Sequence, residues 1–562
     1  MGDSEAFLTS TESGTMLSTP ADTDSALPIG FWDNANKNHR AFPIIVLRFD
    51  DILDGSKLRQ ALSDLLGTGT WRRLGGRLRR EHGKLVLRVP ENYDSQRPAF
   101  AWSEERLYAG TSQSQPVSRL PTTGVMSSAA QRPVVFDASD TIAEFAWPRN
   151  LPRSLDDFIG SDRPLVTIHL TAYTDATLLS IGWPHIMSDI MGLKNLMDAW
   201  ALVLAGKPDC VAPLCPEDPM KDLGRSPCVP LAPRLAAMKG NALPKGQLPR
   251  QVDERHSLWA FFGYITIQLW SLVASLWGPR TTGHSEAAFF TVRLPSQGVE
   301  MVRQRAMAEI AGDHETEEHL DPMTDEAKPL LHKKQNFLST GDIITAWCAS
   351  VAALRFERRS PANFVIGNLY SIRKRLPTLF DEASYSYVQN AQFATWTAAS
   401  AGLAFPDGIT KVGLPGISRL ASQLRLSIVE QTTPDHVEAY AAEERKAMDS
   451  SGGNTAGYVG PGNMMVLMTN WTAANFYRVD FSAAVIVGGT MRQRNDRRIA
   501  PEGHPTWISG WDASRPAAKA PPRGAFILLG LDAAGNYWVT GRVDGVSRTL
   551  VDESVRIFDC PA

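Results

Sequence analysis

The sequence is poor in cysteine and has no excess of positive charge. Five cysteines are spread over 562 residues, their number is odd, and no two of them form a CxxC pair. This pattern argues against a disulfide framework and a zinc site, and it favours a reducing compartment. The formal net charge is −3, whereas a nucleic-acid binder needs a basic stripe. We therefore expect a cytoplasmic protein that binds neither metal nor nucleic acid.

Short motifs of nucleotide, hydrolase and zinc chemistry are also missing. The chain contains no GxSxG elbow, no Walker loop and no complete GxGxxG. The segment HETEEH, residues 314–319, resembles the zinc motif HExxH but has one residue too many. Its two histidines are five positions apart, so a helix would not place them on one face as zinc ligands. These absences argue against a P-loop enzyme, an elbow-type serine hydrolase and a zinc protease.

Neither end of the chain shows a targeting signal. The first 25 residues are acidic and rich in hydroxyl groups, without the basic, apolar pattern of a leader. The final CPA matches no retention or lipidation signal. Residues 1–26 are therefore predicted to be a disordered lead-in, with structured sequence starting near Leu27.

One uncharged run, residues 257–278, is long enough to cross a bilayer. Its polar residues recur at helical spacing and would form a narrow seam on an otherwise apolar helix: Tyr264, Gln268, Ser271 and Ser275. A single span would also leave the two halves of the chain on opposite sides of the membrane, where they could not share an active site. We favour a helix packed on its own protein, then a helix resting peripherally on a membrane surface or an apolar partner, and place a true span last.

The length of the chain predicts two domains, because single cores rarely grow beyond about 250–300 residues. Strand-like runs alternate with amphipathic helices, which indicates an α/β (α+β) fold with mixed sheets flanked by helices. We predict an N-terminal domain over 27–206, a proline-rich crossover over 207–286 and a C-terminal domain over 287–562. The expected strands include 43–49, 164–175, 363–371, 464–471 and 479–488.

The stretch WPHIMSDIMG, residues 183–192, places His185 and Asp189 four positions apart, behind a strand-like run and ahead of a helical pattern. Among eleven histidines, only His185 has an acid at such a short, fixed spacing directly after a strand. Taken alone, the pair is more often a hydrogen-bonded histidine and a helix-capping aspartate than a catalytic centre. The surrounding sequence has to decide between these interpretations.

The surrounding sequence resembles the BAHD acyltransferase family, whose signature HxxxD follows a strand and leads into a helix. The similar segments occur in the family's order and cover most of residues 30–540. They are 56–78, 164–207, 338–347, 368–376, 385–391, 468–471 and 479–484.

The resemblance implies two chloramphenicol-acetyltransferase-like domains with an active-site channel at their interface. It implies an O-acyltransferase that moves an acyl group, foremost acetyl, from acyl-CoA to a hydroxyl. Acetyl-CoA is then a co-substrate, and no cofactor is bound permanently. The apolar run 257–278 suggests an apolar acceptor, a secondary metabolite such as a terpenoid or polyketide alcohol. We expect a monomer.

By the same resemblance, His185 is the general base that takes the proton of the acceptor hydroxyl, a role that suits histidine near pH 7. Thr469 and Trp471 of the TNW segment are candidates to donate hydrogen bonds to the oxyanion or the substrate, and a locally packed strand is the alternative. Helical spacing would let Asp189 orient His185 as in a triad. The resemblance instead favours a site-shaping ion pair between Asp189 and Arg373.

Some positions depart from the family pattern or stay ambiguous. Arg375 is a second choice as partner of the HxxxD aspartate. The glycine that commonly follows this aspartate is Ile190 here, with Gly192 two positions later. The motif DFGWG is reduced to DFSAA, which keeps Asp480 in a role that the resemblance makes structural and remote from the chemistry. These departures resemble the trichothecene O-acetyltransferase-like branch.

Two other functions stay open at this point. A condensation-type transferase would take its acyl group from a carrier protein. Such domains show HHxxxDG, however, and Pro184 and Ile190 occupy the flanking positions here. A non-catalytic relative would serve as a binding module, which the DFSAA segment permits and the retained His185 and Asp189 disfavour. Saturable binding of acetyl-CoA would discriminate among the three functions.

Overall fold

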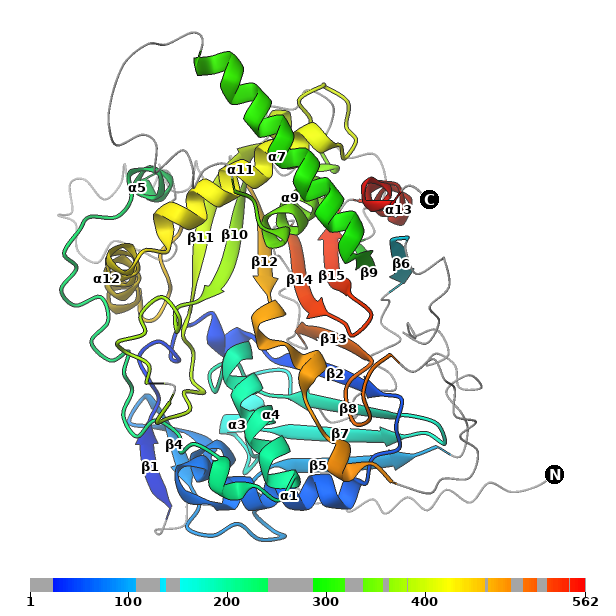
Figure 1. The fold of residues 1–562 in the computed structure, drawn as a ribbon. Helices are drawn as coiled ribbons and strands as arrows, with labels where there is room; N and C mark the ends of the chain where they lie inside the picture. Colours follow the sequence, from blue (N-terminus) through cyan, green and yellow to red (C-terminus); the bar gives the residue numbers. More distant parts are fainter. Residues whose placement is uncertain are drawn as a thin grey trace, which may run out of the picture.

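The computed structural model describes an α/β molecule with three sheets, which confirms the predicted fold class (Figure 1). The predictions for residues 1–23 and for the apolar run 257–278 lie outside the described residues. No helix in the described part combines the length and apolar character that a membrane crossing needs. The described residues are 24–107, 132–137, 152–240, 287–318, 337–356, 363–381, 383–459, 463–486, 499–512, 523–544 and 546–560.

A five-stranded sheet forms the lower half of the molecule in Figure 1, in the order β13-β2-β8-β7-β5. Asp54 begins the first helix, α1 (Gly55–Gly67), by accepting hydrogen bonds from the N–H groups of Ser56 and Lys57. α1 packs beside α4 (Ile190–Leu204) across this sheet. The strands are β13 Trp507–Asp512, β2 Pro43–Phe49, β8 Thr177–Gly182, β7 Thr167–Ala172 and β5 Ala101–Arg106.

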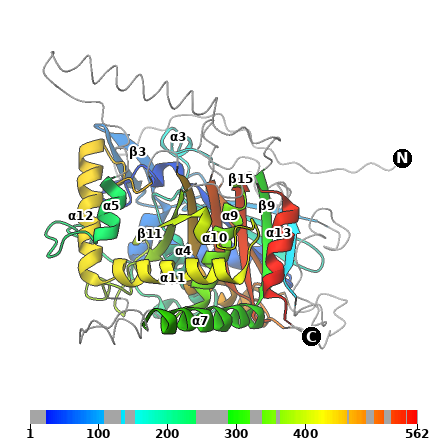
Figure 2. The same cartoon turned by 90° about the horizontal axis from the view of Figure 1, so that it is seen from above.

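A seven-stranded mixed sheet forms the other half, in the order β11-β10-β12-β14-β15-β9-β6. Figure 2 shows α7 (Ser296–Glu318) and α11 (Leu414–Gln431) along the same side of this sheet. α9 (Thr340–Ala353) packs between them and the strands, and Ser339 and Asp342 start it with a capping box. The strands are β11 Gln392–Ser400, β10 Asn363–Ser371, β12 Met464–Asn470, β14 Arg523–Leu531, β15 Asn536–Asp544, β9 Ala287–Pro295 and β6 Val134–Asp137.

Each of these sheets contains one strand from the other half of the chain. β6 pairs antiparallel with β9 in the seven-stranded sheet, and β13 pairs antiparallel with β2 in the five-stranded sheet. The predicted division into continuous domains, 27–206 and 287–562, is therefore wrong at these two strands. The physical reason is that an edge strand has unpaired N–H and C=O groups, and a strand from the other half satisfies them.

A small third sheet, in the order β1-β4-β3, carries the start of the described chain. Its first strand begins at Ser25, two residues before the predicted start of structure, because Ser25 pairs with Val89 in the next strand. The predicted lead-in therefore ends sooner than residue 26. The strands are β1 Ser25–Pro28, β4 Lys84–Val89 and β3 Arg77–Glu81.

The predicted strand at 479–488 is also wrong. Over its described part the chain forms a single turn of 3-10 helix at Ser482–Ala484, followed by one isolated bridge from Val485 to Leu53. The apolar residues of this segment pack individually into the core instead of pairing along a sheet. Phe481, for example, stacks on Phe49 at 5.8 Å between ring centroids.

Three apolar clusters hold the molecule together. One surrounds the five-stranded sheet and the second lies between the seven-stranded sheet and its helices. The third joins the N-terminal loop to α12 (Pro434–Ser451) and β11, and it includes Trp32, Phe393 and Tyr440. This third cluster fixes the geometry of the junction between the two halves. The remaining helices are α3 Asp156–Ile159, α5 Pro233–Gly240, α10 Ala401–Ala404 and α13 Arg548–Ser554.

Candidate active site

His185 lies in a turn between the end of β8 and the start of α4. Its backbone N–H donates to the carbonyl of Ala41 at 2.9 Å, ahead of β2. The indole N–H of Trp183 donates to the carbonyl of Ser188 at 2.9 Å, which closes the turn on itself. The Ser188 hydroxyl donates to the carbonyl of Val388 at 2.6 Å. The turn that carries His185 is thus attached to both halves of the molecule.

Gly192 explains the departure from the family's glycine position. A Cβ at this residue would lie 1.9 Å from the carbonyl oxygen of Val388, which no side chain tolerates. The first turn of α4 therefore approaches the other half of the molecule most closely at residue 192. Ile190 is half-buried and packs against the core of the five-stranded sheet, so the glycine is not needed there.

Asp189 is the N-cap of α4 and forms a buried ion pair with Arg373. Its carboxylate accepts from the guanidinium of Arg373 at 2.9 and 3.0 Å, from Gly192 N–H at 2.9 Å and from Ala391 N–H at 2.8 Å. The side chains of Asp189 and Arg373 are 1% and 4% exposed. These four bonds fill the four acceptor positions of a carboxylate, so none is left for His185. The ion pair implied by the resemblance is present, and its partner is Arg373 rather than Arg375.

The loop that holds Asp189 also holds the backbone of His185. The amide of Asn390 donates to the carbonyl of His185 at 2.8 Å and to the carboxylate of Asp33 at 2.7 Å. The backbone N–H of Asn390 donates to the same Asp33 oxygen at 2.9 Å. Asp33 therefore positions Asn390, which in turn positions the histidine.

The imidazole of His185 is half-buried and faces Gln392, the first residue of β11. The two Nε2 atoms are 3.2 Å apart. The His185 Nδ1 is buried and makes no hydrogen bond with another side chain in the described part of the chain. Burial lowers the pKa of His185, while the charge of Asp189 and the histidine's own backbone carbonyl act in the opposite direction. The ring is consequently neutral near pH 7, the form that accepts a proton.

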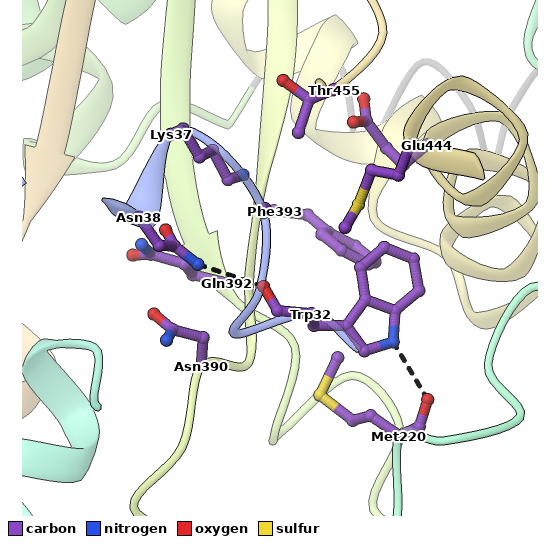
Figure 3. Close-up of a pocket in the computed structure, with 11 residues that line it drawn as sticks. Trp32, Lys37, Asn38, Met220, Asn390, Gln392, Phe393, Glu444 and Thr455 are labelled. Carbon is purple, nitrogen blue, oxygen red and sulfur yellow. Dashed lines mark hydrogen bonds between the residues drawn. The ribbon is translucent and has the colours of Figure 1, made fainter. Parts of the chain in front are cut away.

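Gln392, which contacts the imidazole, also lines a small pocket (Figure 3). Trp32 and Lys37 of the N-terminal loop line it, together with Phe393 of β11 and Glu444 of α12. The indole N–H of Trp32 donates to the carbonyl of Met220 at 2.9 Å, which fixes the aromatic wall. The pocket is therefore built from both halves of the chain, and Gln392 links it to the Nε2 atom of His185.

Thr469 and Trp471 lie at the end of β12, where the seven-stranded sheet meets the five-stranded one. The ring of Trp471 rests on Gly510 of β13, where an added Cβ would lie 2.4 Å from the ring. Within the described residues, neither the Thr469 hydroxyl nor the Trp471 indole N–H makes a hydrogen bond. The structure thus brings both residues to the interface without a hydrogen bond to the histidine.

Asp480 lies at the opposite end of the five-stranded sheet. It is exposed and accepts a hydrogen bond from Ser482 N–H at 2.9 Å. The neighbouring Phe481 packs on Phe49, at the far end of β2 from His185, and lies 4.9 Å from the Trp200 ring. Asp480 is therefore remote from His185, and its neighbour Phe481 packs the DFSAA segment against the N-terminal sheet.

Comparison with known proteins identifies the family. A scan against models of protein families finds no match. The chain is 30% identical to O-acetyltransferase PaAT-2 of Phomopsis amygdali, over 93% of this chain and 96% of that protein. It is 31% identical to acetyltransferase sphE of Aspergillus fumigatus, over 92% of each. The chain belongs to the BAHD family of acyl-CoA-dependent acyltransferases.

Solved structures agree with this BAHD fold. TRI101 of F. graminearum, solved with coenzyme A and T-2 mycotoxin, has a TM-score of 0.55 to this chain at 12% identity, over 94% of this chain and 96% of that one. TRI101 of F. sporotrichioides, also with coenzyme A and T-2, gives a TM-score of 0.54 at 11% identity, over 95% and 96%. At such identities the likeness concerns the fold.

Three residues near this BAHD site carry no local sequence signal, Asp33, Lys37 and Gln392. Asn390 stands out in the sequence only as part of the segment 385–391. Asp33 and Asn390 meet over a separation of 357 residues, so no local spacing connects them. A polar residue inside an otherwise apolar strand start, as at Gln392, is the one signal that the sequence offers.

Asp33 makes the stability of this BAHD acyltransferase depend on pH. Burial raises the pKa of Asp33 to about 7 against the hydrogen bonds from Asn390, whereas an unfolded aspartate titrates near 4. Between pH 4 and 7 the Asp33 carboxyl is therefore protonated in the folded state and ionised in the unfolded state. The contribution of this residue to stability is complete below pH 4 and is lost as the pH rises to 7, by up to roughly 1.4 kcal/mol per unit.

Asp33→Asn should remove this decline, since an amide keeps the acceptor oxygen without the charge. The measurement is the free energy of unfolding of both proteins across pH 4 to 8. Asp64→Asn, at an exposed carboxylate on α1, is the matched control and should follow the wild type. Parallel curves for wild type and Asp33→Asn would contradict the prediction.

Proposed function

We propose that this protein transfers an acetyl group from acetyl-CoA to a hydroxyl of an apolar secondary metabolite, a terpenoid or polyketide alcohol, with His185 as general base. The observation that carries the proposal is a neutral imidazole held at the junction of the two halves, whose Nε2 contacts Gln392 at 3.2 Å. The ion pair of Asp189 with Arg373 keeps the aspartate away from the ring. A base in this environment is ready to accept a proton from an incoming alcohol.

The tautomer of His185 follows from its surroundings. The amide nitrogen of Gln392 can only donate, so its contact with His185 Nε2 at 3.2 Å favours a lone pair on Nε2 and the proton on Nδ1. As the hydroxyl oxygen attacks the thioester carbon, its proton moves to Nε2 and a C–O bond forms. The C–S bond then breaks and Nε2 returns the proton to the CoA thiolate. This reaction needs neither a metal ion nor a redox partner, because the C–O bond replaces the C–S bond and His185 only moves the proton.

Thr469 and Trp471 are the proposed donors to the oxyanion of the tetrahedral intermediate. Their support is their common position at the end of β12, beside β13 and the sheet that carries His185. Donors that are placed in advance stabilise a developing negative charge by about 2.7–4 kcal/mol each.

Trp471→Phe should lower kcat by about 10²–10³-fold, because it removes the indole N–H and keeps an aromatic ring on Gly510. KM for acetyl-CoA should change little. Steady-state kinetics check this expectation, and Trp507→Phe, a buried tryptophan of β13, is the control for the loss of an indole. A decrease in kcat of less than about threefold in Trp471→Phe would contradict the oxyanion role.

The names of similar proteins support acetyl transfer to oxygen. PaAT-2 is described as an O-acetyltransferase and sphE as an acetyltransferase, and TRI101 was solved with coenzyme A and a mycotoxin. The apolar run 257–278, which lies outside the described residues, motivates the apolar acceptor. A carrier-protein donor lacks such support.

The test is mass spectrometry of a metabolite extract incubated with purified protein and isotopically labelled acetyl-CoA. The expected result is a labelled acetyl ester with wild type and none with His185→Ala. Release of free thiol should appear in step with the ester. Absence of any labelled product with wild type, while a carrier-bound acetyl group is transferred, would replace the proposal with the condensation-type reaction.

A further inference from the structure

The Nε2 atom of His185, which the proposed reaction needs as proton acceptor, already has a hydrogen-bond partner in the protein. The amide nitrogen of Gln392 lies 3.2 Å from it. An amide nitrogen only donates, so this hydrogen bond uses the lone pair that an attacking hydroxyl requires. The other ring nitrogen, Nδ1, is buried and has no partner among the described residues. Gln392 therefore covers the proton-accepting atom of the base.

The backbone on which Gln392 stands is fixed relative to the histidine. The preceding Asn390 donates to the carbonyl of His185 at 2.8 Å, and Ala391 N–H donates to Asp189 at 2.8 Å. Gln392 itself is the first residue of β11 and is half-buried. A rotation of its side chain is therefore enough to expose or cover Nε2, and the strand does not have to move.

Water is the nucleophile that competes with an alcohol for an uncovered base. A water molecule at Nε2 would give its proton to the ring while its oxygen attacks the thioester carbon and a C–O bond forms. The C–S bond would then break, and Nε2 would return the proton to the CoA thiolate. The products are acetate and free coenzyme A, so the acyl group is lost. Acyl transfer to an alcohol therefore requires that water be kept from the base.

An apolar alcohol has a source of binding energy near Gln392 that water lacks. Gln392 lies on the same face of the seven-stranded sheet as Leu369 and Thr469, because Ser371 pairs with Gln392 and Leu369 pairs with Thr469. The helices α9 and α11 pack on the opposite face. Leu369 and Leu467 are half-buried and belong to none of the three apolar clusters of the described residues. An apolar skeleton that covers them removes apolar surface from water, which offsets the loss of one hydrogen bond.

We infer that Gln392 is a specificity-determining residue, which keeps water from His185 until an alcohol binds. The inference rests on the proposed function and adds to it the means by which hydrolysis is avoided. The hydroxyl of the bound alcohol takes the place of the amide at Nε2. The amide turns toward the small pocket of Figure 3, which Gln392 lines and which has room for about one water molecule. Water makes no contact with the apolar face and leaves the amide in place.

Gln392→Ala should release acetate from acetyl-CoA without any acceptor at least about threefold faster than wild type, because the hydrogen bond that covers Nε2 is gone. Gln392→Asn should behave in the same way, since its amide is one methylene too short to reach the ring. It replaces the alanine variant if the latter melts below wild type. The measurement is labelled acetate from isotopically labelled acetyl-CoA. Gln60→Ala, at an exposed glutamine of α1, is the matched control and should hydrolyse at the wild-type rate.

The double variant His185→Ala/Gln392→Ala tests the route of the extra hydrolysis. Its acetate release should fall to the level of His185→Ala, because the water needs the imidazole. In the metabolite extract, the amount of thiol released per labelled ester should be higher for Gln392→Ala than for wild type. Wild-type rates of acetate release in both Gln392 variants, or extra hydrolysis that persists without the imidazole, would overturn the inference. A wild type that forms no labelled ester would instead remove the proposed function itself.

Discussion

His185→Ala is expected to abolish acyl transfer and to leave the melting temperature close to that of wild type. The loss follows because general base catalysis contributes about 10²–10⁴-fold to the rate, and no other base lies at the Nε2 position. Stability is preserved because the ring is half-buried and its one side-chain hydrogen bond is to Gln392. The backbone bonds that hold the turn, to Ala41 and Asn390, do not involve the ring.

Thiol release from acetyl-CoA measures the loss of turnover, and thermal unfolding measures the melting temperature. His504→Ala is the matched control, because His504 lies near Asp480 at the far end of the sheet. It should keep full turnover. More than a tenth of the wild-type rate in His185→Ala would show that the assignment of the base is incorrect. A large drop in melting temperature would mean that the residue has a structural role instead.

Breaking the ion pair of Asp189 with Arg373 has the largest expected effect on stability. Asp189→Asn and Arg373→Met should each lower the free energy of unfolding by about 3–5 kcal/mol, because each leaves an uncompensated buried charge or polar group. The double variant should lose less than the sum of the two, because it leaves neither charge unpaired. Turnover should fall together with stability. Ala391 N–H donates to Asp189 and the neighbouring Asn390 donates to the His185 carbonyl, so a shift of this loop would displace the histidine.

Denaturant unfolding of the single and double variants measures this coupling. The control is Asp198→Asn on the same helix, which breaks a partly exposed ion pair with Lys194 and should cost about 1 kcal/mol. If Asp189→Asn loses turnover while its stability stays at the wild-type value, the aspartate orients His185 as in a triad. That result would contradict the geometry in which Arg373 and two backbone N–H groups occupy the carboxylate.

Local pattern and resemblance predicted a large part of this molecule. The strands expected at 43–49 and 363–371 coincide with β2 and β10. Short apolar runs rich in β-branched residues favour a buried strand. The HxxxD segment predicted the turn between β8 and α4. The ion pair with Arg373 followed from resemblance alone, since 184 residues separate its partners.

The features that the sequence did not predict all depend on long-range contact. The strand expected at 479–488 has the composition of a strand, but Phe481 and its neighbours find partners in the core of the other half. The exchange of β6 and β13 has no local sequence signal. Whether a strand pairs with a sheet edge depends on which strand edges the folded sheets leave unpaired, and these edges are formed by distant residues. Lys37 and Gln392 look like ordinary surface and strand residues until the fold places them beside one imidazole.

The exchanged strands also make the two halves of the chain depend on each other. β13 forms backbone hydrogen bonds along β2 from Trp507 to Asp512, and β6 does so along β9. A fragment that ended before residue 287 would lack β13, and a fragment that began there would lack β6. Each fragment would expose the edge of an incomplete sheet, so neither half is expected to fold well by itself.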